Sequence, residues 1–319
     1  MVAGQGVLAS VSAIVPFPDR HEGKSAIIIG TFDGVHRGHQ YLIEKASDIA
    51  RARSFRTVAL TFDPPPRMVL RPDTAYRLLT SVPDRIRLLR RFGVDDVVVC
   101  AFDHEIARLS AEEFCTELVD KLGMQVLLGG PDLALGNRRL GTPDVLREIG
   151  QRLGFEVEIA ESYDWNGRAI RSHEIRQLSR DGCVVDAAAL LGHPLTISGL
   201  VVHGDARGRT IGFPTANLAI DDQHLLPGNG VYAVRAGIGE DRVPGVMNVG
   251  VRPTVDGTRL MVEVHLLDKS PDLYGQRLSV ELITRIRDEQ RFGSLEALIE
   301  QIRRDVEHAR RILSGVAID

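Results

Sequence analysis

The sequence is poor in cysteine, has no marked excess of charge of one sign and contains no repeats, and each shortage excludes a class of protein. Its three cysteines, Cys100, Cys115 and Cys183, are widely spaced and form no CxxC pair, which excludes a disulfide framework and the usual zinc and redox motifs. A net charge of −4 over 319 residues gives no sign of a polyanion-binding surface, so we expect no nucleic-acid partner. Internal repeats and low-complexity segments are also absent, which excludes a solenoid.

Long apolar runs are missing as well. The stretch from Met1 to Pro18 is apolar in places, but it lacks a basic start followed by a sustained apolar segment. We therefore expect neither a signal peptide nor a membrane span, and we expect a cytoplasmic protein. What is present, 44% hydrophobic and 26% charged residues, is typical of a globular protein long enough for two domains. The oligomeric state is not readable from the sequence.

In the first half of the chain, apolar runs of strand length alternate with segments of helical periodicity. This alternation predicts a parallel sheet covered by helices. The strands are expected at Ser25–Gly30, Arg56–Phe62, Asp96–Phe102, Gln125–Gly129 and Phe155–Ile159, and the helices at Tyr41–Ala50, Asp84–Phe92, Ala111–Leu122 and Pro143–Leu153, followed by short helices at Ser172–Arg180 and Asp186–Leu191.

After Gly192 the pattern changes to short β-rich stretches interrupted by glycine and proline, which predicts a small antiparallel barrel. The tail from Ser294 to Leu313 has apolar residues at helical spacing behind a serine cap, so one amphipathic helix should pack on that barrel. The barrel strands are expected at Leu195–His203, Gly230–Ala236, Val243–Val249, Leu260–Leu267 and Arg277–Arg285.

The segment from Gly30 to His39, GTFDGVHRGH, follows the first expected strand and opens a helix. An open parallel sheet binds ligands at this position, where glycines let the backbone approach an anion and the helix start offers unpaired N–H groups. His36 and His39 are three residues apart and can both donate to phosphoryl oxygens. A lone HxGH would more often be an ordinary loop, but its place after a strand favours phosphate binding.

These residues, unbroken from Gly30 to Gln40, resemble the signature of the FMN adenylyltransferase module of bacterial bifunctional riboflavin kinase/FAD synthetases. The resemblance implies a Rossmann-like HxGH nucleotidyltransferase domain in which a phosphate oxygen of FMN attacks the α-phosphorus of ATP and pyrophosphate leaves. It makes His36 and His39 catalytic. It implies nucleotide-binding roles for Gly30, Phe32, Asp33, Gly34, Asp132, Ser172 and Arg176.

Three other motifs of that module are altered here. The segment Thr61–Pro66 reads TFDPPP where the family resembles TFxPHP, and Gly129–Gly136 reads GGPDLALG where the family resembles GxDFRFG. The segment Ile170–Arg176 reads IRSHEIR in place of ISSTxIR. Three alternatives follow for this domain: a divergent FMN adenylyltransferase, a transferase with another acceptor, or a nucleotide-binding relic.

The stretch from Gly204 to Asn217 joins a glycine-rich loop to the tetrapeptide PTAN. Glycines let such a loop bend over a nucleotide, and its arginines would add positive charge near phosphates. Thr215 and Asn217 are two residues apart, so on an extended segment their oxygens point to the same side, where they suit Mg²⁺. An isolated PTAN would more often be a proline turn capped by Asn217, and the partner motifs decide for a cation site.

Glu263 lies in an expected strand, Leu260–Leu267, whose alternation places Glu263 and His265 on the face opposite Val262 and Val264. We expect its carboxylate to face the barrel mouth. A carboxylate of ordinary pKa within reach of a primary hydroxyl could act as a general base for attack on the γ-phosphorus of ATP. The pattern alone favours an ordinary solvent-exposed strand glutamate, and only the resemblance given below selects Glu263.

The region resembles the riboflavin kinase module throughout, including the runs PTAN, VEVHLLD and IR before Phe292. The resemblance implies that Thr215 and Asn217 bind Mg-ATP, that Glu263 activates the ribityl 5′-hydroxyl, and that the loop from Gly204 to Gly212 covers the phosphates. In that loop it implicates Gly204, Arg207, Gly208 and Gly212.

Taken together, we predict an α/β plus β protein. Residues 1–186 should form the FMN adenylyltransferase-like domain and residues 187–319 the riboflavin kinase domain, acting on riboflavin, FMN and ATP with Mg²⁺. The product would be FAD. A rival of another class is a non-catalytic flavin or nucleotide sensor, against which the complete set of Thr215, Asn217 and Glu263 argues.

Overall fold

The structure is a computed structural model that describes residues 23–204, 207–239, 241–254, 257–268 and 271–315, with the backbone alone at 207, 252–254 and 257–259. The expectation for Met1 to Pro18 therefore lies outside the described residues. The chain forms two compact units. Unit 1 contains the described residues up to 76 together with 86–164, and unit 2 contains 77–85 together with the described residues from 165 onward.

Unit 1 is built on a five-stranded parallel sheet with the order β3-β2-β1-β4-β5. This confirms the predicted α/β class. Its strands are β1 (Ser25–Ile29), β2 (Arg56–Asp63), β3 (Asp96–Ala101), β4 (Met124–Gly129) and β5 (Glu156–Ile159). Its helices are α1 (Arg37–Arg53), α2 (Pro66–Leu70), α4 (Ala111–Leu122) and α5 (Pro143–Leu153), with the 3₁₀ turns η1 (Ile106–Arg108) and η2 (Asn137–Arg139) and most of α3 (Val82–Arg91).

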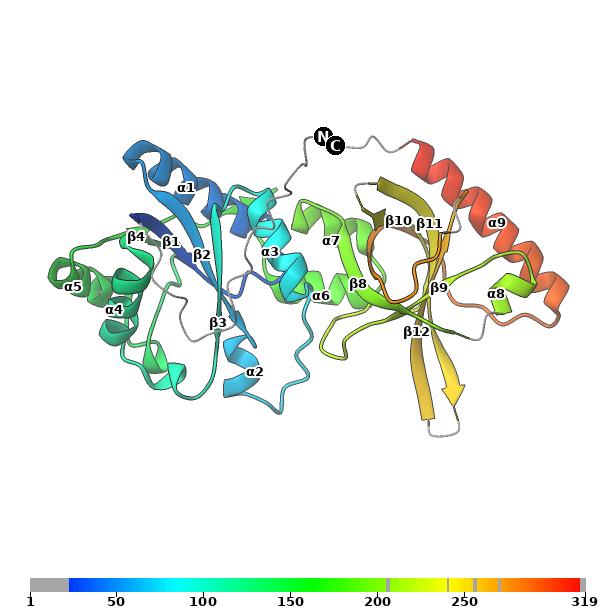
Figure 1. Ribbon diagram of the computed structural model, residues 1–319, viewed down its shortest axis with the longest axis horizontal. Helices are drawn as coiled ribbons and strands as arrows, with labels where there is room; N and C mark the ends of the chain where they lie inside the picture. Colours follow the sequence, from blue (N-terminus) through cyan, green and yellow to red (C-terminus); the bar gives the residue numbers. More distant parts are fainter. Residues whose placement is uncertain (1–22, 205–206, 240, 255–256, 269–270, 316–319) are drawn as a thin grey trace, which may run out of the picture. The chain divides into compact units, whose positions relative to one another are not determined.

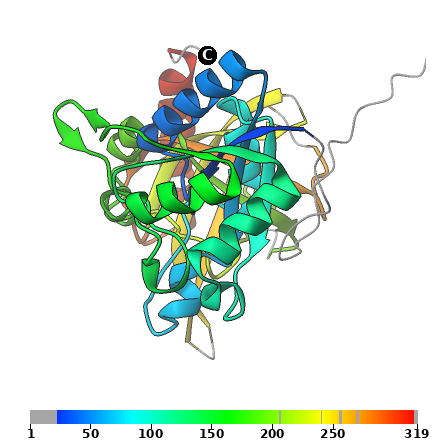
Figure 2. The ribbon, with the colours of Figure 1, turned by 90° about the vertical axis from the view of Figure 1, so that its left-hand side faces the viewer.

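Successive residues of β1 point to opposite faces of this sheet, and each face has its own core. Ile27 packs in the cluster that includes Phe114 of α4 and Leu146 of α5. Ile28 packs in the other cluster, with Ile43 of α1. Helices α4 and α5 thus cover one face and α1 the other, which can be followed in Figure 2. Burial on both faces explains why the strands read as continuous apolar runs.

Unit 2 is a closed six-stranded antiparallel barrel with the order β10-β11-β12-β9-β8-β13 (Figure 1). Its strands are β8 (Leu195–Val202), β9 (Ala216–Ala219), β10 (Gly230–Ile238), β11 (Asp241–Thr254), β12 (Gly257–Leu266) and β13 (Arg277–Arg287). Its helices are α6 (Ser172–Arg180), α7 (Val184–Leu191), α8 (Arg207–Thr210) and α9 (Leu295–Ser314). Two short strands precede α6, β6 (Asp164–Trp165), which spans the boundary between the units, and β7 (Arg168–Ala169).

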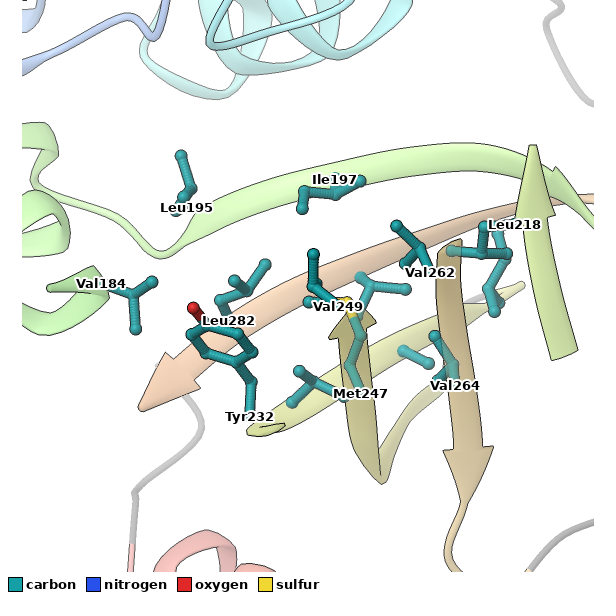
Figure 3. Close-up of a cluster of buried hydrophobic side chains, with 14 of the residues drawn as sticks. Val184, Leu195, Ile197, Leu218, Tyr232, Met247, Val249, Val262, Val264 and Leu282 are labelled. Carbon is teal, nitrogen blue, oxygen red and sulfur yellow. The ribbon is translucent and has the colours of Figure 1, made fainter. Parts of the chain in front are cut away.

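The barrel interior is filled by apolar side chains, among them Tyr232, Met247, Val262 and Val264 (Figure 3). Outside the barrel, α9 contributes Ala309 and Leu313 to a second cluster against the strands. Ser294 caps α9 as predicted, since its hydroxyl accepts a hydrogen bond from the Ala297 amide at 3.2 Å. The predicted barrel and terminal helix are confirmed.

Several short elements have no counterpart among the expected elements. They are α2, α8, β6, β7, β9 and the 3₁₀ turns, none longer than five residues. Segments of this length contain too few residues to show a period. The sequence of α8, Arg-Gly-Arg-Thr, contains a glycine, which also argues against predicting a helix there. The segment expected to be a loop from Gly204 to Gly212 therefore proved to contain one unpredicted turn of helix.

The three cysteines are free, and they differ in exposure. Burial raises the pKa of both Cys100 and Cys115 to about 12, whereas Cys183 is exposed. Because the thiolate is the reactive form, we expect iodoacetamide at neutral pH to alkylate the folded protein at Cys183 alone. Peptide mass spectrometry should find Cys100 and Cys115 labelled only after denaturation, and labelling of either in the native protein would contradict their burial.

Candidate active sites

Unit 2 contains a cavity of about 470 Å³ on the outer face of the barrel. Its walls come from the segment before β9, the outward faces of β11 and β12, the segment after β13, and α9. The lining residues that the argument uses are Gly208, Phe213, Thr215, Asn217, Glu263 and His265. One wall is polar, and the wall formed by α9 is largely apolar, with Leu298, Ile302 and Val306. Such a mixture suits an organic ligand that also carries polar groups.

The structure brings together three predicted residues, Thr215, Asn217 and Glu263. All three line the cavity. Asn217 on β9 is paired directly with Glu263 on β12 in the antiparallel register, so their side chains lie side by side on one face. Thr215 is the residue directly before β9, two positions from Asn217, so on an extended chain the two side chains point to the same side. Residues 46 positions apart in the sequence thus form one polar cluster.

Asn217 carries an unsatisfied acceptor. Its side-chain Oδ1 is buried and has no hydrogen-bond partner within the described part of the chain. A buried acceptor without a donor costs about 1–3 kcal/mol, and a bound cation would remove this cost. The oxygens of Thr215 and Asn217 therefore fit a hard cation such as Mg²⁺. No cluster of three His, Cys, Asp or Glu residues able to hold a metal occurs among the described residues, and a hydroxyl–amide site would not contain one.

The glycine-rich loop lies directly against Thr215 and Asn217. A Cβ atom at Gly204 would lie 2.2 Å from the Asn217 side-chain nitrogen, and one at Gly208 would lie 2.3 Å from the Phe213 carbonyl oxygen. Only glycine permits so close an approach. Gly212 adopts a positive φ of 85° in open space. The side chain of Arg207, predicted to face the phosphates, lies outside the described residues.

The sequence suggested that Glu263 faces the barrel mouth. In the structure it lies on the outer face of the barrel instead. Val262, Val264 and Leu266 are buried and belong to the core of the barrel, while Met261, Glu263 and His265 point outward into the cavity. The predicted alternation was correct, and a terminal helix was expected on the barrel, but the pattern could not show that α9 lies over this particular face. Asp305 of α9, 4% exposed, forms a bidentate ion pair with Arg287 of β13, which donates from Nε to Oδ1 and from Nη2 to Oδ2, and so fixes the helix over the cavity.

In unit 1 the predicted histidines meet at the start of α1. His36 is the N-cap of the helix, and its Nδ1 accepts a hydrogen bond from the His39 amide at 3.4 Å. The two imidazole rings stack with centroids 3.7 Å apart. Because Nδ1 of His36 is an acceptor, a neutral ring carries its proton on Nε2, from which it can donate to a ligand. The helix N-terminus adds partial positive charge at the same place.

The turn before α1 is strained. Phe32 and Val35 adopt positive φ values of 48° and 38°, which cost bulky residues about 1–3 kcal/mol each. Both side chains are almost fully buried, as is Asp33, and Phe32 contacts the His39 ring edge-on. The turn, which also contains Gly30 and Gly34, follows β1 at the point where the strand order reverses between β1 and β4. Open sheets bind ligands at this point.

Asp132 lies on the loop after β4, the strand next to β1. Its side chain is exposed, and its carbonyl accepts a hydrogen bond from Arg139 at 2.6 Å. Leu133 and Leu135, two of the residues that depart from the family motif, are buried in the core of unit 1. The loop after β4 is therefore packed against the core by leucines, although it lacks the aromatic side chains of the family motif.

Ser172 and Arg176 belong to unit 2, where both lie on α6. Ser172 is the first residue of the helix. Arg176 is buried, and its Nε donates to the Arg77 carbonyl at 2.9 Å. Glu174, whose negative charge would oppose an anion, forms an ion pair with Arg168 at 2.6 Å.

Several cavity residues were not singled out from the sequence. They are Phe213, Asn248, His265, Arg287, Glu289, Phe292 and Asp305. The pattern of β12 placed His265 on the same face as Glu263, which was a usable signal. Asp305 gave none, because one aspartate in an amphipathic helix looks like any solvated charge.

Two family models match this chain. The one described as riboflavin kinase matches residues 191–313, and the one described as FAD synthetase matches residues 19–174. Curated relatives include proteins named bifunctional riboflavin kinase/FMN adenylyltransferase. The relative from Escherichia coli K12 is 43% identical over 89% of this chain and 91% of its own. The relative from Pseudomonas fluorescens is 40% identical over 93% and 95%, and that from Bacillus subtilis 35% over 92% and 94%.

A solved structure is similar over nearly the whole length. A crystal structure from Streptococcus pneumoniae, titled a macrolide-efflux protein, superposes with a TM-score of 0.82 at 34% identity and covers 92% of this chain and 96% of its own. In the described residues of the present chain, no helix is both long and apolar enough to cross a membrane.

Proposed function

Since the chain belongs to the bifunctional riboflavin kinase/FMN adenylyltransferase family, we propose that riboflavin is phosphorylated in the cavity of unit 2. We propose that FMN is adenylylated in unit 1 at the turn from Gly30 to His39, which we call the histidine turn. The chain is an enzyme of flavin cofactor biosynthesis that uses ATP. We assign the adenylyltransferase domain to residues 1–186 and the kinase domain to residues 187–319. The observation that carries the kinase assignment is the meeting of Thr215, Asn217 and Glu263 in one cavity.

In the kinase step, the Glu263 carboxylate accepts the proton of the ribityl 5′-hydroxyl. The hydroxyl oxygen of riboflavin attacks the γ-phosphorus of ATP at the same time, and ADP leaves. Glu263 projects into the cavity beside Asn217, so base and phosphate ligands are adjacent. Gly204 approaches the side chain of Asn217 and Gly208 approaches Phe213 and Thr215, so the backbone at these glycines lies beside the proposed phosphate ligands.

Thr215 and Asn217 are the residues that would hold Mg²⁺, with the buried Oδ1 of Asn217 as the unsatisfied acceptor. When bound, Mg²⁺ neutralises charge on the phosphates of ATP. The amide of Asn217 contributes no charge of its own, so the site relies on the substrate phosphates for charge balance. Such a site would bind Mg²⁺ together with ATP and only weakly without it.

In the adenylyltransferase step, a phosphate oxygen of FMN attacks the α-phosphorus of ATP, and pyrophosphate leaves. His36 and His39 stabilise the charge that develops on the phosphoryl oxygens, together with the N-terminus of α1. No protein nucleophile is needed. The strained, buried turn at Phe32 and Val35 holds the donors in place before substrate binds.

Riboflavin, FMN and ATP are thus the proposed small-molecule partners. The absence of a nucleic-acid or membrane partner and a cytoplasmic location stay predictions from the sequence.

The test is to incubate the purified protein with riboflavin, ATP and Mg²⁺ and to follow the flavins by chromatography. We expect FMN to appear first and FAD to follow it, and we expect EDTA to stop both. FMN without FAD would leave a kinase whose first domain is inactive or uses another acceptor, as the altered motifs at Pro65, Leu133 and His173 allow. The absence of FMN would overturn the kinase assignment.

A further inference from the structure

The proposed Mg-ATP ligands Thr215 and Asn217 lie at the end of a strand, where regular pairing stops. Strand β9 pairs with β12 through Leu218, Asn217 and Ala216, which lie opposite Val262, Glu263 and Val264. Continuing this register would place Thr215 opposite His265, but no backbone pairing is formed there. Thr215 therefore needs another support to hold its hydroxyl in the cavity.

His265 supplies that support. Its Nδ1 lies 2.8 Å from the carbonyl oxygen of Pro214. A carbonyl oxygen only accepts, so Nδ1 carries the proton and donates it. Thr215 is then held on both sides, by the ladder at Ala216 and by the side chain of His265 at Pro214.

The same imidazole also supports the glycine loop. Its ring meets the Phe213 ring edge-on, with centroids 5.6 Å apart. The Phe213 amide in turn donates to the Gly208 carbonyl at 2.8 Å. A single side chain on β12, two residues from Glu263, thus contacts the segment that carries Thr215 and the loop that covers the phosphates.

We propose that His265 is a positioning residue of the kinase site, which uses its Nδ1–H to hold Pro214 and thereby fixes the hydroxyl of Thr215 beside Asn217 and Glu263. The expected effect of His265 on catalysis rests on the proposed kinase function. The expectation that His265 fixes the segment carrying Thr215 does not depend on that function. The imidazole acts through the peptide segment and transfers no proton to or from substrate.

Three substitutions separate this role from its alternatives. The amide nitrogen of asparagine occupies nearly the place of Nδ1, whereas that of glutamine reaches the place of Nε2. We expect His265→Ala and His265→Gln to raise the KM for ATP and the Mg²⁺ concentration for half-maximal FMN formation about tenfold or more, the cost of one hydrogen bond to a critical segment. His265→Asn should stay within about threefold of the wild type.

A second measurement needs no catalysis. Hydrogen exchange of the ligand-free full chain, followed by mass spectrometry on peptides that contain residues 215–218, should be faster in His265→Ala and His265→Gln and near normal in His265→Asn. The exposed His308 on α9 provides a matched control, and His308→Ala should change neither readout.

The outcomes are distinct. An Asn variant as impaired as the Ala and Gln variants would overturn the proposal and indicate a role for the whole imidazole, including proton transfer through Nε2. Unchanged kinetics and exchange in His265→Ala would also overturn it. If wild-type protein makes no FMN, the proposed function fails, while the exchange measurement still decides whether His265 fixes the Thr215 segment.

Discussion

Replacing Glu263 by glutamine should reduce FMN formation about 10²–10⁴-fold, the usual contribution of a general base. Glutamine keeps the shape of the side chain beside Asn217 but cannot accept the proton of the ribityl hydroxyl. The loss should appear in kcat, with little change in the affinity for riboflavin or ATP. Steady-state kinetics of FMN formation, with binding measured by titration of flavin fluorescence, tests both parts of this expectation.

A matched control comes from the same barrel. Glu281 on β13 is also a partly buried strand glutamate, but it pairs with Arg242 at 3.5 Å and does not line the cavity. Glu281→Gln should leave kcat within about twofold of the wild type, since a partly exposed ion pair contributes little. Phosphorylation at the wild-type rate by Glu263→Gln would remove Glu263 from the mechanism. A protein that acts only as a sensor would show a change in affinity alone.

The long elements of the fold were predictable because their periodicity matches how they are buried. Helices α4, α5 and α6 were predicted at the observed ends from their helical periodicity, and in the structure Ser110 caps α4. Strand β9 was not, because four residues, Ala-Asn-Leu-Ala, show neither alternation nor β-branched side chains. Yet β9 is the strand that closes the barrel and positions Asn217.

The residues of the candidate kinase site could be predicted from the sequence, but the location of the site on the outer face of the barrel could not. The alternation of β12 showed that Glu263 and His265 share a face, and the resemblance to riboflavin kinases selected Glu263. The sequence predicts that a terminal helix packs on the barrel, but nothing local shows that α9 lies over the face that carries Glu263, because the Arg287–Asp305 pair joins residues 18 positions apart on different elements. Contacts of this kind depend on tertiary packing, which a single sequence does not encode in any short pattern.

Substituting both His36 and His39 by alanine should abolish FAD formation while FMN formation stays within about twofold of the wild type. Each histidine is expected to supply a donor to the phosphoryl oxygens, and loss of one such donor costs about 10²–10³ in rate. Among the described residues, those that line the kinase cavity belong to unit 2, so its activity should be independent of the change. Chromatography of a reaction started from FMN and ATP measures the adenylyl transfer separately.

The control and the altered motifs make this experiment decisive for unit 1. His104 is exposed on the loop after β3, and His104→Ala should form FAD at the wild-type rate. Persistence of FAD synthesis in the double variant would show that the histidine turn is not the reaction site. The buried Leu133 and Leu135 keep the loop after β4 packed although the motif has lost its aromatics, so we expect the wild-type protein to retain adenylyl transfer. In that case the loss in the double variant reports on the histidines themselves and not on an already inactive domain.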